Sequence, residues 1–122
     1  MNKKPDVLRA KTFAFAKQIV VLYQKLEEKQ KFFALSKQLL RSGTNPGAMV
    51  REAAGAESGR DFIHKLSIAQ KEMGETIYWL ELLHETNYIK EEDFIQIKTN
   101  AEEILRILIA SIKTKKKNLA TS

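Results

Sequence analysis

The sequence contains no cysteine and only two prolines among its 122 residues. Without cysteine the chain can form neither a disulfide nor a thiolate metal site, a composition that fits a reducing compartment. The scarcity of proline and the abundance of Ala, Leu, Ile, Lys, Glu and Gln are typical of a helical domain and not of a disordered chain. The length fits one domain, residues 1–122, whose stability must come from packing.

Long apolar runs are also missing. No uncharged stretch approaches the roughly 18 residues that a membrane span requires. The first residues, MNKKPDVLRAK, lack the apolar core of a signal peptide. We therefore expect a soluble, cytoplasmic protein with no membrane partner.

Positive charge is present in excess, and it is unevenly distributed. The formal net charge is +6. Residues 1–41 carry ten Lys or Arg against three acids, residues 42–110 carry seven against twelve, and residues 111–122 carry four against none. Basic surface near the two ends of the chain would attract RNA or DNA by counterion release, although a well-solvated basic protein has the same composition.

Apolar residues recur at spacings of three and four, which predicts four amphipathic helices at about 6–28, 31–56, 59–86 and 90–116. In the first helix the row of apolar residues along one side, here called a seam, consists of Val7, Phe13, Ala14, Ala16, Ile19, Val20, Tyr23 and Leu26. The third is Phe62, Leu66, Ala69, Met73, Ile77, Leu80 and Leu83, and the fourth is Phe94, Ile97, Ala101, Ile104, Leu105, Leu108 and Ile112. Short connections make sequential helices antiparallel, so we predict an all-α, up-and-down antiparallel four-helix bundle.

Several helix ends can be predicted from single residues. Ser58 followed by Asp61 has the spacing of a capping box at the start of the third helix. Asn87 can close that helix in a left-handed conformation. The fourth helix should fray within the tail KTKKKNLATS, which begins at Lys113.

The stretch RSGTNPGAMVREAAGAESGRDF holds four of the five glycines. It is not a phosphate-binding loop, because Gly43 and Gly47 are too close together and no Lys follows either. Pro46 allows two outcomes: a kinked but continuous second helix, or a helix that stops and restarts with Thr44 or Asn45 as N-cap. The apolar seam favours the continuous helix. Its small residues (Gly43, Gly47, Ala48, Ala53, Ala54 and Gly55) would then let another helix approach closely.

Two groups of residues are candidate functional sites. A polar stripe on the third helix consists of Asp61, Lys65, Glu72, Glu75 and Trp79, with Arg41, Arg51 and Glu52 as candidate partners on the second helix. It is interpreted either as a subunit contact or ligand groove, or as ordinary ion pairing. The basic residues Lys3, Lys4, Arg9, Lys11, Lys113, Lys115, Lys116 and Lys117 should gather at one end of the bundle.

Catalytic and metal sites have little support. A di-iron bundle needs two Glu-x-x-His motifs, and this chain has one, Glu81 to His84. No Ser, His and Asp combination forms a recognisable motif. We therefore expect no enzyme activity, no metal and no cofactor.

The stretch QLLRSGTNPGAMVREAAGAESGRDFIHKLSIAQKEMGETIYWLELL resembles the bacterial 23S rRNA intervening-sequence proteins, a family that is grouped with the accessory variability determinants of diversity-generating retroelements. The matching residues are Gln38–Arg41 with Ser42, Glu52, Ala53, Ser58, Asp61, Phe62, Lys65, Ala69, Lys71, Glu72, Glu75, Tyr78, Trp79 and Leu80. At Met49 the chain departs from family members that have Asn.

The resemblance implies an up-and-down four-helix fold, commonly assembled as a homopentamer, without an established enzymatic activity. For the retroelement branch it also implies nucleic-acid binding and association with a reverse transcriptase. Our main expectation is a non-enzymatic, self-assembling helical protein that binds RNA or DNA through phosphate contacts at its basic end. The alternative is a protein-interaction adaptor, for example for a reverse transcriptase, with no direct nucleic-acid role.

Overall fold

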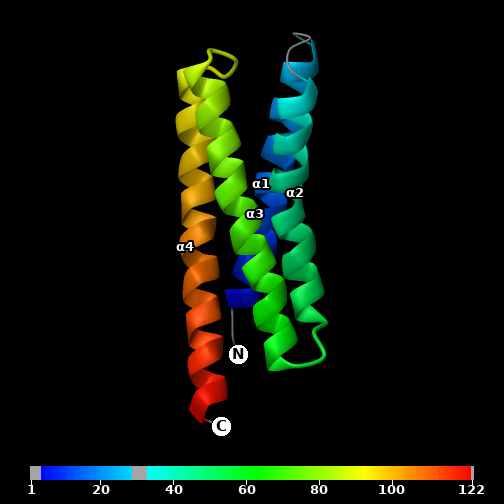
Figure 1. Ribbon diagram of the computed structural model, residues 1–122, viewed down its shortest axis with the longest axis vertical. Coiled ribbons are helices and arrows are strands. Elements are labelled where there is room, and N and C mark those ends of the chain that lie inside the picture. Colours follow the sequence, from blue (N-terminus) through cyan, green and yellow to red (C-terminus); the bar gives the residue numbers. More distant parts are fainter. Residues whose placement is uncertain (1–3, 29–32, 122) are drawn as a thin grey trace.

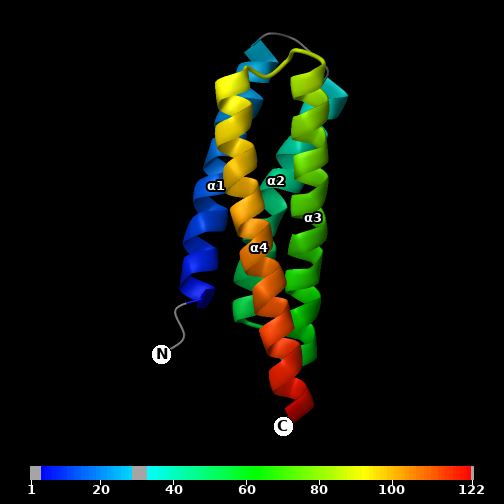
Figure 2. The same cartoon turned by 90° about the vertical axis from the view of Figure 1, so that its left-hand side faces the viewer.

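The computed structural model describes residues 4–28 and 33–121, with side chains from Val7 to Glu28 and from Ala34 to Thr121. It contains four helices: α1 (Lys4–Glu28), α2 (Phe33–Ala54), α3 (Gly59–Glu85) and α4 (Glu91–Thr121). The helices run alternately up and down along one long axis, so α1 begins and α4 ends at the same end of the bundle (Figures 1 and 2). Each helix packs on its neighbours in sequence, and α1 also contacts α4, less extensively. The predicted up-and-down bundle is confirmed.

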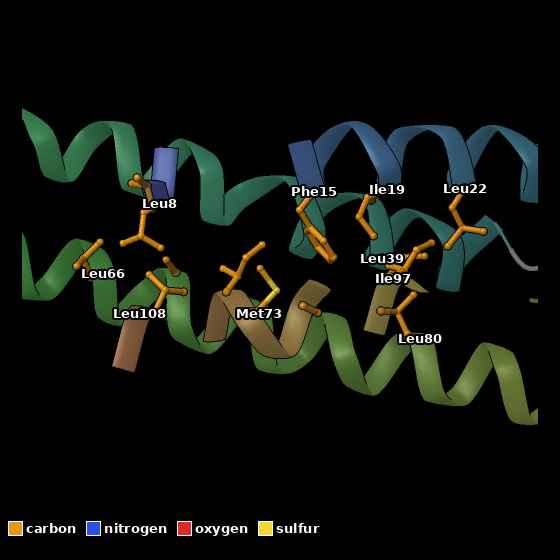
Figure 3. Packing of buried hydrophobic residues seen from close by; sticks show 14 of the residues in the cluster. Leu8, Phe15, Ile19, Leu22, Leu39, Leu66, Met73, Leu80, Ile97 and Leu108 are labelled. Carbon is orange, nitrogen blue, oxygen red and sulfur yellow. The ribbon is translucent and has the colours of Figure 1, made fainter. Parts of the chain in front are cut away.

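The core is a continuous apolar column along the bundle axis (Figure 3). It is lined by one stripe from each helix, in which Leu8, Phe15, Leu39, Leu66, Met73, Leu80, Ile104 and Leu108 are among the most buried side chains. The predicted seams of α3 and α4 supply most of their share. No helix in residues 4–28 and 33–121 is long and apolar enough to cross a membrane.

The predicted seam of α1 was right for Ile19 and Leu26, which are buried, and wrong for the face of its other large residues. Val7, Phe13 and Val20 are exposed, whereas Leu8, Phe15 and Leu22 point into the core. α1 is apolar on more than one side, so two stripes satisfy the spacing of three and four residues. The larger Leu and Phe side chains, repeating every seven residues, bury more apolar area than the Val stripe and decide the orientation.

α2 continues through Pro46, as the continuous alternative predicted. The proline is fully buried, so its ring adds apolar surface to the core. The Thr44 hydroxyl donates to the Leu40 carbonyl at 2.7 Å within the helix, and it does not cap a new one.

Close approach of α1 and α2 depends on one of the α2 glycines. A β-carbon on Gly43 would stand 2.7 Å from Cγ1 of Ile19, closer than packed atoms approach. At Gly47 it would stand 3.5 Å from the Thr12 carbonyl oxygen, an ordinary contact. A β-carbon on Gly55 would meet only the helix's own end, at the Glu52 carbonyl. The predicted small-residue side is therefore needed for close packing at Gly43 and not along its whole length.

The ends of α3 follow the predicted signals. The Ser58 hydroxyl accepts from the Asp61 backbone N–H at 3.0 Å, and the Asp61 carboxylate accepts from the Glu57 N–H at 3.3 Å. Asn87 has the left-handed φ of 68°. The next helix differs from the prediction: α4 does not fray near residue 116 but stays helical to Thr121.

Contacts with α3 hold the last turns of α4 in place. A β-carbon on Gly59 would lie 2.6 Å from Cδ2 of Leu119, so Leu119 packs directly onto the first residue of α3. One turn earlier, the Lys115 ammonium lies 5.3 Å from the centre of the Phe62 ring. These two contacts explain why the basic tail remains helical.

Candidate nucleic-acid interface

The basic tail of α4 is a charged, solvent-facing helical surface. Lys113, Lys116 and Lys117 are exposed, and Lys115 is half-buried over Phe62. No acidic residue follows Glu103 in the sequence, so α4 supplies no carboxylate that would neutralise this end. The tail therefore presents a set of ammonium groups in a fixed helical arrangement, which suits contacts with phosphates.

The tail packs on the start of α3, which brings further acids and bases close to it. Glu57 is exposed in the preceding loop, and Asp61 is engaged in the cap. Arg60 is exposed beside them. The contact of α4 with α3 thus adds one cation and one free carboxylate, and the surface stays basic.

The predicted N-terminal basic cluster is only partly described. Lys3 lies outside the described residues, and the side chain of Lys4 does as well. Arg9 is exposed. Lys11 forms an ion pair with Glu103 of α4 at 3.2 Å, which neutralises its charge. α1 begins and α4 ends at the same end of the bundle (Figure 2), and among the described side chains α4 carries more unpaired cations there than α1.

The polar stripe of α3 faces α2. The Arg41 guanidinium lies 3.1 Å from Oε1 of Glu72 and 3.5 Å from Oε1 of Glu75. Glu72 is only 8% exposed, so this ion pair is largely removed from water on the glutamate side. One helical turn after Glu72, the hydroxyl oxygens of Thr76 and of Ser42 on α2 lie 2.9 Å apart, and both residues are fully buried. The stripe thus fixes α3 against α2 within a single chain.

A second ion pair links the lower halves of the same helices. Lys65 Nζ lies 3.1 Å from Oε1 of Glu52. The hydrogen bond to Glu52 and the negative charge of Glu52 raise the pKa of Lys65. Partial burial of the ammonium group lowers this pKa, and the negative charge of Asp61 raises it slightly further, so the pKa remains above its ordinary value. Arg51, the other candidate partner, does not join the stripe, because it is turned toward α1.

Trp79 is half-buried at the upper end of the stripe, with the Tyr78 ring edge-on at 5.1 Å. Its indole Nε1 is buried and has no hydrogen-bond partner in the described part of the chain, and the same holds for Oε2 of Glu72. Tyr78 is exposed. Among the described residues, the stripe therefore has one donor and one acceptor without a hydrogen-bond partner.

The single Glu-x-x-His motif is occupied by contacts within the chain. Glu81 pairs with Lys98 at 3.2 Å. His84 Nε2 lies 2.6 Å from Oε1 of Glu91, and its ring stacks on Phe94 with centres 4.0 Å apart. Among residues 4–28 and 33–121 no three His, Asp or Glu side chains are grouped so that they could hold a metal ion.

The sequence reasoning missed an exposed aromatic site on the face that α1 and α2 share. Phe13 was placed in the core, but it is 48% exposed. The Arg51 guanidinium carbon lies 5.0 Å and the Lys17 ammonium 5.2 Å from the centre of its ring. The signal was present in the sequence: residues 7–26 contain four cations and no acid, and Phe13 lies off the Leu8–Phe15–Leu22 stripe.

Comparison with known proteins places this geometry in a family. A crystal structure of a protein of unknown function from the S23 ribosomal protein family of Bacteroides thetaiotaomicron is 51% identical. It matches with a TM-score of 0.87, over 90% of this chain and 98% of that one. None of the functionally curated proteins matches the sequence. The model of the 23S rRNA-intervening sequence protein family matches residues 7–110, and this chain, as its sequence motifs predicted, belongs to that family.

Proposed function

We propose that this protein is a non-enzymatic, self-assembling helical protein that binds RNA or DNA through the basic tail of α4, mainly by phosphate contacts. The single observation that carries the proposal is the exposed row Lys113, Lys116 and Lys117 on a helix that α3 holds in place. An ordered row of ammonium groups releases counterions from a phosphate backbone without reading its sequence.

Exposed apolar side chains support the self-assembly part of the proposal. Val21, Tyr78, Ile95 and Ile109 are each about half exposed, and they are distributed over α1, α3 and α4. Large apolar groups on several faces favour contacts with further copies of the chain. Assembly around a symmetry axis would also bring several basic tails together and strengthen the positive field.

The test is a salt titration of nucleic-acid binding with two charge-matched triple variants. The tail variant carries Lys113→Ala, Lys116→Ala and Lys117→Ala, and spares Lys115 because it packs on Phe62. The control carries Lys37→Ala, Lys71→Ala and Lys90→Ala, which are exposed elsewhere on the bundle. Both variants lose three positive charges, so any difference between them reports position and not net charge.

For a fluorescent single-stranded RNA we expect the tail variant to bind more weakly and with a shallower salt dependence. The slope of log K against log salt should fall by about 0.7 for each phosphate that the tail no longer neutralises. The control should stay close to the wild type. An absence of wild-type binding at low salt would rule out the proposal, and equally weakened binding in both variants would remove the role of the tail. Light scattering on the same samples measures the assembly.

An adaptor for another protein, such as a reverse transcriptase, is the second candidate. The exposed Tyr78, which lies edge-on to the half-buried Trp79, favours it, because aromatic side chains are frequent anchors of protein interfaces. A reverse transcriptase captured by the wild type after nuclease treatment, and no longer captured by Tyr78→Ala, would support this role.

A further inference from the structure

The face shared by α1 and α2 carries an exposed aromatic ring with two cations close to it. Phe13 is 48% exposed. Arg51 reaches it from α2 and Lys17 from the next turn of α1, both within about 5 Å of the ring centre. An isolated exposed Phe needs no explanation, but a half-exposed ring with both an Arg and a Lys close to it is a defined local arrangement.

The cations of this face are not neutralised by acids. No ion pair joins Arg9, Lys17 or Arg51 to any carboxylate among the described side chains, whereas Lys11 and Lys25 pair with Glu103 and Asp93 on α4. The face that turns away from α4 therefore keeps its positive charge.

Among the side chains that the structure describes, the carboxylates closest to Phe13 along α1 and α2 are either far from the ring or already paired. Glu52 follows Arg51 but pairs with Lys65 on the side of α3. The first carboxylate after Asp6 along α1 is Glu27, which lies about 20 Å beyond Phe13 at the rise of an α-helix. An approaching polyanion thus meets attraction and little repulsion at Phe13.

Resting on the nucleic-acid role proposed above, we propose that Phe13, Arg51 and Lys17 form a stacking site for a base of single-stranded RNA or DNA. The base lies against the exposed part of the Phe13 ring, and the guanidinium and ammonium groups contact the flanking phosphates. Single-strand binding surfaces combine these two elements, an aromatic side chain and a positive track along the backbone. Duplex bases are already stacked and cannot reach the ring.

Charge argues against the same face of a second copy of this chain as the occupant. A contact made by the same face of two copies would place Arg9, Lys17 and Arg51 of one copy against the same cations of the other. Like charges that meet across an interface suppress association. A polyanion carries negative charge, which is complementary to the positive charge of this face.

The test separates stacking from charge by using two probes. One is a fluorescein-labelled oligo(U), and the other is polyphosphate, which has the charge but no base. Phe13→Leu keeps apolar bulk and removes the aromatic ring, while Phe13→Trp keeps a stacking surface. Since the ring is half exposed, all variants are expected to fold, which circular dichroism checks.

We expect Phe13→Leu to weaken oligo(U) binding by about tenfold and leave polyphosphate binding unchanged, because removal of one stacked base has an effect of that order. Phe13→Trp should bind oligo(U) at least as well as the wild type. Arg51→Gln should weaken both probes. Equal effects of Phe13→Leu on both probes, or no effect on either, would overturn the inference.

Two further outcomes distinguish this inference from the function on which it rests. If the tail triple variant loses salt-dependent RNA binding while Phe13→Leu changes nothing, the proposed function stands and the stacking site does not. If Phe13→Leu changes the mass measured by light scattering, the ring belongs to a contact between copies, and the stacking site is excluded. A wild type that binds neither probe overturns both.

Discussion

Leu119, near the end of α4, packs on Gly59, the first residue of α3, where a β-carbon would stand 2.6 Å from Cδ2 of Leu119. The contact joins residues far apart in the sequence at the end of the bundle that carries the basic tail. Gly59 thus leaves the space that lets the tail of α4 fold against α3.

The first prediction is that Gly59→Ala releases the tail. The new methyl group meets a flexible leucine end, which can move, so the free energy of unfolding should change by less than about 1 kcal/mol. The rate of amide hydrogen exchange over residues 115–121 should nevertheless rise, because Leu119 can no longer pack against residue 59. Leu119→Ala should speed the same exchange without a clash at Gly59. Unchanged protection of the tail in Gly59→Ala would contradict the assignment.

The second prediction orders three glycine-to-alanine changes by the space around them. Gly43→Ala places a methyl group 2.7 Å from the buried Ile19 and should destabilise the fold by about 1–3 kcal/mol through overpacking. Gly74→Ala meets no atom within 4 Å and should stabilise α3 by about 0.5–1 kcal/mol. Gly47→Ala should fall between them.

Chemical denaturation of the three variants tests this order. Ile19→Ala removes Cγ1, Cγ2 and Cδ1, the three atoms that a β-carbon on Gly43 would meet. Its cost should therefore be smaller in the Gly43→Ala background than in the wild type, and unchanged in the Gly74→Ala background. If Gly43→Ala were as stable as Gly74→Ala, α1 and α2 would not approach at Gly43 as closely as the structure shows.

The third prediction concerns the ion pair between Arg41 and the largely buried Glu72. Arg41→Met removes the partner of a carboxylate that is only 8% exposed, and it should destabilise the fold by about 1–3 kcal/mol. Glu72→Gln in the Arg41→Met background should recover part of this stability, because the uncompensated charge disappears. The more exposed Glu75 is the matched control, and Glu75→Gln should change the free energy of unfolding by less than about 0.5 kcal/mol.

Most of the fold could be predicted from the sequence because the signals for it are local. The capping residues Ser58 and Asp61, the left-handed Asn87 and the seams of α3 and α4 act within one helix or one turn. The alternatives at Pro46 were also decided by a local pattern, the apolar seam that runs through it.

The errors came from contacts between helices. The choice between the Phe13 and Phe15 faces of α1 depends on which stripe buries more area against three other helices. The length of α4 depends on the packing of Leu119 against Gly59 of α3. The candidate site was affected in the same way: the partners of Arg41 and Lys65 lay among the residues considered, whereas Arg51 turned to a ring that had been assigned to the core.

The last prediction follows from the ion pair between Lys65 and Glu52, which raises the pKa of Lys65 above its ordinary value of 10.5. A group whose pKa is higher in the folded state contributes stability that is fully present below the unfolded pKa and is lost as the pH rises through the folded one. The free-energy difference between the wild type and Lys65→Met should therefore be constant from pH 7 to about 9.5, and it should shrink above about 10.5. In a Glu52→Gln background the same comparison should show a smaller difference with little dependence on pH, because the main cause of the raised pKa is gone. A difference that stays constant to well above pH 10.5 would mean that Lys65 contributes through packing of its side chain and not through the charge of its ammonium group.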